Sequence, residues 1–212
     1  MSKIDLAGRN SQSSGARRDD LSSRRLFINA LLISSAYYTG ALVGFALTFS
    51  DDAVSTLWPP NAILLAGLLL TPTKSWWIVV LAALPAHFAV QIQSSVPLLM
   101  IFCWFISNCA EALVGAWLFR YFVQGEVVDF RNFRHVVLFI KTAVLFSPFA
   151  TSFLDAGLVV LNQWKQPDFW EVWKMRFPAN ALAALTVAPA LIIWNGTIAK
   201  QFWVELRSRW ME

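Results

Sequence analysis

Six apolar stretches recur along this chain, and they constrain its fold more than any other feature. Short polar or proline-containing segments separate them, and they cover residues 26–49, 57–70, 76–90, 98–122, 135–161 and 173–194. Charged residues make up 14% of the sequence, whereas about a quarter is usual in a soluble domain. An apolar stretch of about 20 residues is long enough to cross a bilayer as a helix. The sequence therefore predicts an all-α integral membrane protein, a polytopic bundle of about six transmembrane helices.

Basic residues are distributed unevenly between the two sides of this predicted bundle. If the N-terminus is cytoplasmic, fourteen of the 17 Lys and Arg residues fall on the cytoplasmic side and three on the other. Cytoplasmic loops of membrane proteins carry an excess of Lys and Arg. We therefore expect a multi-pass protein of the bacterial inner (plasma) membrane with both termini in the cytoplasm. Because the basic residues lie in loops and tails, nucleic acid is not expected as a partner.

Composition divides the chain into three segments. Residues 1–25 are polar and rich in Ser and Arg, which predicts a disordered cytoplasmic tail. Residues 26–197 hold the predicted six-helix transmembrane domain. Residues 198–212 are amphipathic, with Phe202, Leu206 and Trp210 on one side, and they are expected to form a cytoplasmic linker helix.

The second apolar stretch begins with Trp58-Pro59-Pro60-Asn61 and is only about 15 residues long. Two prolines can open a helix, because the first N–H groups of a helix are unpaired in any case. One interpretation is a plain proline-started helix with a boundary Trp. The other is a rigid polar entrance that leaves room for water, a ligand or another chain segment. In the preceding stretch, Gly40 and Gly44 have the spacing that lets helices approach closely.

Prolines within the longer stretches predict irregular helices. A kink is expected at Pro85 in the third stretch, and a break or bend at Pro148 in the fifth.

Polar side chains inside apolar stretches are costly, so they are normally paired or functional. With the orientation above, polar residues from four helices fall at similar depth in the outer half of the bilayer. They suggest a ligand pocket opening to the outside; the alternative is an interhelical hydrogen-bond network that holds the bundle together. The candidate ligand-binding residues are Trp58, Asn61, His87, Gln91, Asp155, Arg176 and Asn180.

Asn108 and Glu111 lie one helical turn apart in the fourth stretch and are expected to form a structural polar pair. His87 and Asp155 could act as an acid–base pair, but no nucleophile or set of metal ligands accompanies them. We therefore expect no enzymatic activity, cofactor or metal.

Several motifs resemble the membrane-associated sensor domain family of bacterial signalling proteins (MASE, first class). Trp58-Pro59-Pro60-Asn61 is the most specific of them. The others are Asn108 to Leu113 with Leu118-Phe119-Arg120, Phe130 to Phe133 leading to Pro148 and Gly157, Phe169-Trp170 with Trp173, Asn180-Ala181-Leu182, and Pro189-Ala190-Leu191 ending at Trp194. The chain departs from the family pattern at Ala62, where Gly is usual, and around Asn180, where an acid and a Trp pair are usual.

The resemblance implies an integral membrane sensory input domain that takes part in signal transduction, for example in a two-component system. Such a domain passes an extracytoplasmic or intramembrane signal to a cytoplasmic effector, a kinase or a cyclic-dinucleotide enzyme, whose motifs this chain lacks. The expected partners are the lipid bilayer, an effector domain or partner protein, and a second copy of the chain in a homodimer. The alternative is a stand-alone membrane subunit or small transporter-like protein.

Overall fold

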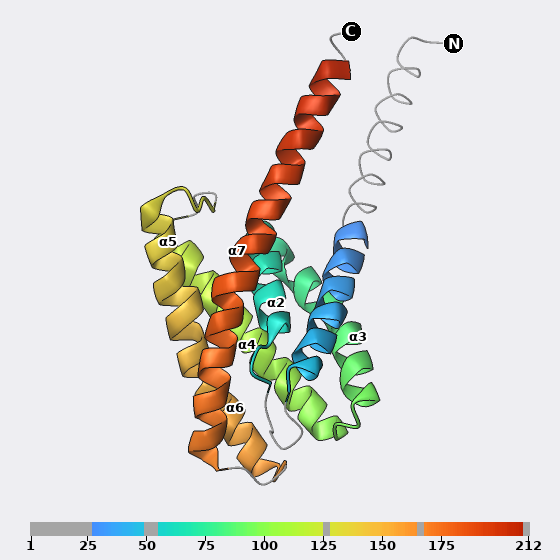
Figure 1. Cartoon of the computed structure of the whole chain (residues 1–212), viewed down its shortest axis with the longest axis vertical. Helices are drawn as coiled ribbons and strands as arrows, with labels where there is room; N and C mark the ends of the chain where they lie inside the picture. Colours follow the sequence, from blue (N-terminus) through green and yellow to red (C-terminus); the bar gives the residue numbers. More distant parts are fainter. Residues whose placement is uncertain (1–26, 49–54, 125–127, 165–167, 210–212) are drawn as a thin grey trace, which may run out of the picture.

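The computed structural model describes residues 27–48, 55–124, 128–164 and 168–209, which form helices and the turns between them. The N-terminal helix Phe27–Ala46 comes first. It is followed by α2 (Pro59–Leu70), the short η1 (Thr73–Ser75), α3 (Trp76–Gln93), α4 (Leu98–Phe122), α5 (Phe133–Phe139), η2 (Ile140–Phe146), α6 (Ser147–Leu161) and α7 (Phe169–Arg209). The predicted all-α bundle is confirmed (Figure 1).

Five helices in the described part of the chain are long and apolar enough to cross a membrane. They are Phe27–Ala46, Thr73–Gln93, Leu98–Phe122, Phe133–Leu161 and Phe169–Asn195. Large apolar side chains on their outer surfaces are exposed, among them Trp77, Leu99 and Ile106. A surface of this kind is compatible with lipid contact and not with water.

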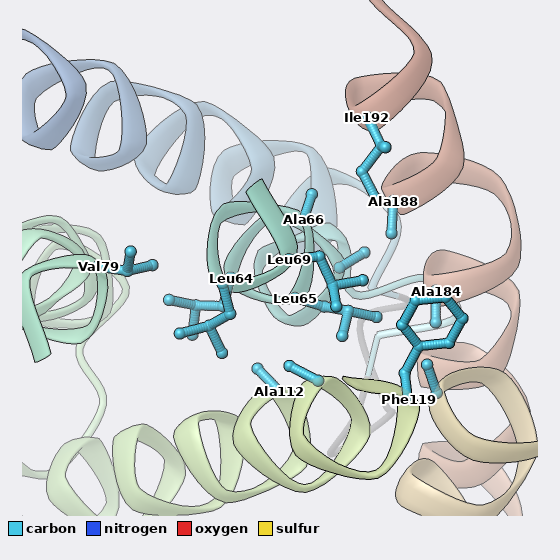
Figure 2. Close-up of a cluster of buried hydrophobic side chains, with 14 of the residues drawn as sticks. Leu64, Leu65, Ala66, Leu69, Val79, Ala112, Phe119, Ala184, Ala188 and Ile192 are labelled. Carbon is cyan, nitrogen blue, oxygen red and sulfur yellow. The ribbon is translucent and has the colours of Figure 1, made fainter. Parts of the chain in front are cut away.

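The short helix α2, which is not among these five, lies in the centre of the bundle. Its 12 residues span about 18 Å at 1.5 Å per residue, less than the ~30 Å thickness of the hydrocarbon core. Ten of the 12 are buried, and α2 packs against α3, α4 and α7. Figure 2 shows Leu64, Leu65 and Leu69 of α2 surrounded by Val79 of α3, Ala112 of α4 and Ala184 of α7. Such a helix contacts protein on all sides, so its polar residues act on the neighbouring helices.

The fifth apolar stretch is irregular just before Pro148, as its sequence predicts. The turns from Ile140 to Phe146 are π-helical, and α6 resumes at Ser147 with Pro148 in its first turn. A proline has no N–H and its ring collides with the carbonyl group four residues earlier, so the preceding turn must widen. Pro85 lies inside α3 and does not end it.

α7 has 41 residues and is about 60 Å long, roughly twice the thickness of the hydrocarbon core. It continues from the bundle to Arg209 without a break, so residues 198–209 of the expected linker form the end of this helix. The start of the N-terminal helix and the end of α7 lie at the same end of the bundle (Figure 1). The expected tail 1–25 and residues 210–212 lie outside the described residues.

Candidate functional site: a buried polar interior

The carboxylate of Glu111, on α4, joins three helices. Its Oε2 accepts hydrogen bonds from Asn180 Nδ2 of α7 at 2.7 Å and from Thr151 Oγ1 of α6 at 3.1 Å. Ser147 Oγ, at the start of α6, donates to the main-chain oxygen of Glu111 at 2.6 Å. Asn61, in the first turn of α2, lies beside the same carboxylate, although neither of its amide atoms meets hydrogen-bond geometry. A negative charge is favourable beside the first turn of a helix, where the dipole of α2 is positive.

A second hydrogen-bonded chain ties the N-terminal helix to α3 and α4. His87 Nε2 lies 2.9 Å from the main-chain oxygen of Ile101, which can only accept, so Nε2 carries the hydrogen. Nδ1 of the neutral ring is then an acceptor, and Tyr37 Oη donates to it at 2.9 Å. The Tyr37 oxygen in turn accepts from Asn108 Nδ2 at 3.0 Å. All three side chains are at most 1% exposed, so the chain fixes one tautomer of His87.

Asp155, on α6, has no hydrogen-bond partner for either carboxylate oxygen, although it is 0% exposed. Ser107 of α4 lies beside it, and the positive charge of Arg176 on α7 acts on it. The guanidinium carbon of Arg176 lies 5.3 Å from the centre of the Trp104 ring, a cation–π arrangement. Charged and hydroxyl groups thus converge between α4, α6 and α7 without being paired to one another.

The seven candidate ligand-binding residues are all at most 5% exposed, so no molecule outside the bundle reaches them in this packing. Asn61 and Asn180 meet at Glu111, and Asp155 faces Arg176. His87 bonds instead to Tyr37. Both side-chain polar atoms of Gln91 are buried and unpaired. Their role as ligand-binding residues remains a prediction.

The expected pair of Asn108 and Glu111 is divided between the two networks. Asn108 donates to Tyr37, whereas Glu111 accepts from Asn180 and Thr151. Both residues are buried on α4, and a direct bond between them is absent from the hydrogen bonds of the described residues. Their structural role remains a prediction.

Trp58 is buried inside the bundle. Its side chain is 5% exposed and packs edge-on against Phe45 at 5.6 Å between ring centres. A Cβ atom on Gly44 would lie 2.6 Å from its ring, so the absence of a side chain at Gly44 makes room for the indole. A Cβ on Gly40 would likewise lie 3.3 Å from Pro59 Cβ. The two glycines therefore form a close packing face, as their spacing predicts, and its partner is the Trp-Pro-Pro segment.

The C-terminal end of α2 is held by two donors from neighbouring helices. Arg120 Nη2, from the last turn of α4, donates to the main-chain oxygens of Leu69 at 2.8 Å and Thr71 at 2.9 Å. Trp76 Nε1 donates to the main-chain oxygen of Leu68 at 2.8 Å. The Leu68 oxygen also accepts from the Thr71 N–H at 3.3 Å. The last carbonyl groups of a helix lack partners within it, and a positive charge at this end complements the helix dipole.

Several residues of the polar interior are missing from the sequence prediction. Tyr37, Thr151, Ser147 and Ser107 are isolated in apolar stretches, and a single hydroxyl is too common in membrane helices to be a signal. Arg120 could have been identified from the sequence, because an Arg in the last turn of a span is placed to bind the carbonyl groups at helix ends. Among the described residues, no group of three or more His, Cys, Asp or Glu is placed to hold a metal ion.

One of three comparisons with known proteins finds a match. No curated protein and no solved structure matches the chain. The family model MASE1 matches residues 30–211, most of the sequence, including all the described helices from residue 30 onwards. The chain therefore belongs to the MASE1 family, whose members are membrane sensory input domains.

Proposed function

We propose that the chain senses an extracytoplasmic or intramembrane signal through its buried polar residues and passes it along α7 to a cytoplasmic effector, a kinase or a cyclic-dinucleotide enzyme. The chain itself catalyses no reaction. One observation carries the proposal: α7 holds Arg176 and Asn180 in the polar interior and runs unbroken to Arg209. A displacement at these two residues would therefore be carried along one continuous helix, which contains Pro189 between Asn180 and its far end.

Unpaired polar atoms support a second packing of the helices. The buried atoms without hydrogen bonds include Asn61 Oδ1 and Nδ2, both oxygens of Asp155, and Arg176 Nε. An unpaired polar group in an apolar interior costs on the order of 1–3 kcal/mol. A ligand or helix movement that pairs several of these atoms supplies the few kcal/mol that a population shift requires. The π-helical turns of η2, next to α6, provide irregular backbone of a kind often found at functional sites.

The orientation that fits this function places both termini in the cytoplasm of a bacterial cell. The two ends of the described chain lie at one end of the bundle (Figure 1). The turn with Lys74 and the segment with Arg131 and Arg134 connect helices at that same end. The positive-inside tendency then assigns that end to the cytoplasm.

Changing Asn61 to Leu, or Asp155 to Asn, is expected to alter signalling output without loss of membrane insertion. Both side chains lie in the polar interior, 2% and 0% exposed, and neither change adds a charge to a span. The output is measured with a kinase or cyclase reporter fused after Glu212, and insertion by membrane fractionation. Asp168→Asn is the control, because Asp168 is exposed in the turn before α7. Normal output from both variants would show that the polar interior does not detect the signal.

Neutralising Lys3, Arg24 and Arg25 together is expected to give a mixed population of orientations. These residues lie outside the described ones, in the segment preceding the N-terminal helix, where positive charge directs topology. A reporter at the N-terminus that is active on only one side of the membrane measures the fraction in each orientation. Lys174→Gln, an exposed change on α7, is the control. A uniform population in the triple variant would contradict the assignment.

A further inference from the structure

Asp155 and Glu111 are the two buried acidic side chains among the described residues, and their surroundings differ. Glu111 Oε2 accepts two hydrogen bonds, from Asn180 and Thr151. Asp155 accepts none on either oxygen and is 0% exposed. A buried ionised carboxylate without hydrogen bonds costs far more than a neutral carboxylic acid in the same place. This packing around Asp155 therefore favours the protonated acid.

Arg176 is the cation whose charge acts on Asp155, yet its guanidinium group is not bonded to the Asp155 carboxyl group. Its guanidinium group is stacked over the Trp104 ring at 5.3 Å, and no hydrogen bond joins it to the Asp155 oxygens. Its charge nevertheless acts on Asp155. Arg176 therefore has two alternative partners on different helices: the Trp104 ring of α4, which it occupies here, and the carboxylate of α6.

The other charged groups around α6 do not neutralise Asp155. On α4, the Glu111 carboxylate repels a negative charge at Asp155, and Ser107 supplies only a hydroxyl. On η2 and α7, Lys141 and Lys174 are exposed. An ionised Asp155 would thus depend on Arg176.

We propose that Asp155 is a proton-binding site of the membrane interior. With the proton bound, the carboxylic acid is neutral and Arg176 stacks on Trp104. When the O–H bond breaks, the proton passes to water at the membrane surface, and the resulting carboxylate draws Arg176 from the Trp104 ring into an ion pair. No other bond is made or broken, and the net charge of the interior falls by one.

Only the link between this proton site and the signalling output rests on the proposed function. Arg176 lies one helical turn before Asn180 on α7, and Asn180 is bonded to Glu111. A movement of Arg176 from α4 towards α6 would therefore shift α7 relative to the helices on both sides. The state of the proton can be measured without any signalling assay, so the two proposals can fail separately.

Infrared spectroscopy of the full chain in lipid vesicles tests the proposal directly. A protonated carboxylic acid has a carbonyl band that is separate from the bands of carboxylates and amides. At neutral pH we expect a band of this kind that shifts when the protein is labelled with ¹³C at the side-chain carboxyl of aspartate. The other aspartates among the described residues, Asp129 and Asp168, are exposed, so Asp155 is the buried aspartate of this part of the chain. The labelled wild-type chain needs no variant to fold.

Two variants make the assignment specific. Asp155→Asn is expected to abolish the band, whereas Asp168→Asn is expected to leave it unchanged. Absence of an aspartate-sensitive band in the wild type would overturn the proposal. So would a band that appears only when sodium is replaced by choline, because an alkali cation would then be the natural occupant. If the band behaves as expected and Asp155→Asn signals normally, the proton site stands and its link to output is wrong.

Discussion

Replacing Glu111 by alanine is expected to lower the free energy of unfolding of the purified protein by about 2–5 kcal/mol. The change removes the acceptor for Asn180 and Thr151, and it leaves the fully buried Asn180 amide without a hydrogen bond. Thr151 retains its bond to the main-chain oxygen of Ser147, so Asn180 bears most of the loss. Truncation also opens a cavity where α4 meets α6 and α7. Unfolding in mixed micelles, followed by loss of helical circular dichroism, measures the effect.

Two variants separate the hydrogen bonds from the other consequences of the change. Glu111→Gln keeps one oxygen acceptor and most of the volume, so a smaller loss of about 1 kcal/mol is expected. Glu171→Ala removes an exposed carboxylate on α7 and is expected to stay within about 0.5 kcal/mol of the wild type. If the free energy of unfolding of Glu111→Ala equals that of Glu171→Ala, the Glu111 carboxylate does not hold the helices together.

The long helices could be predicted from the sequence because hydropathy alone determines them. A stretch that exceeds the thickness of the bilayer core must satisfy its main-chain groups internally, so it is helical whatever its neighbours are. The irregular turns before Pro148 follow from the covalent structure of proline for the same reason. The position of α2 is different, since its 12 residues are too short for that argument. Only the surrounding helices determine that it lies in the centre.

Some of the buried polar residues could be predicted from the sequence, but which of them bond to one another could not. Buried Asn, Asp, Arg and His side chains stand out in apolar stretches because they are costly there. Which of them meet depends on helix rotation and depth, which hydropathy leaves open. Asn108 and Glu111 share one helix, yet their partners Tyr37 and Asn180 come from opposite ends of the chain. The burial of Trp58 could not be predicted for a related reason: tryptophan is common at membrane boundaries, and only the packing shows that Gly44 leaves space for this indole.

Replacing Gly44 by alanine is expected to destabilise the protein by about 1–3 kcal/mol. The added methyl group would lie 2.6 and 2.7 Å from two atoms of the Trp58 ring. The indole is rigid and packed against Phe45, so the N-terminal helix and the start of α2 must separate. Alanine otherwise favours a helix over glycine by up to about 1 kcal/mol, so a net loss would show that the contact with Trp58 dominates. Denaturant unfolding of the purified protein measures the sign.

Gly157→Ala is the matched control, because Gly157 lies inside the α6 helix and a Cβ atom there meets nothing within 4 Å. It is expected to be neutral or slightly stabilising. Gly40→Ala should lie between the two, since its closest contact, at 2.5 Å, is the flexible end of Ile63, which can turn away at little cost. The loss of stability is thus expected to decrease in the order Gly44, Gly40, Gly157, following the rigidity of the atoms that contact each glycine. Equal stability of the three variants would mean that the Trp-Pro-Pro segment does not pack tightly on the N-terminal helix, and α2 would then lack its fixed position beside Glu111.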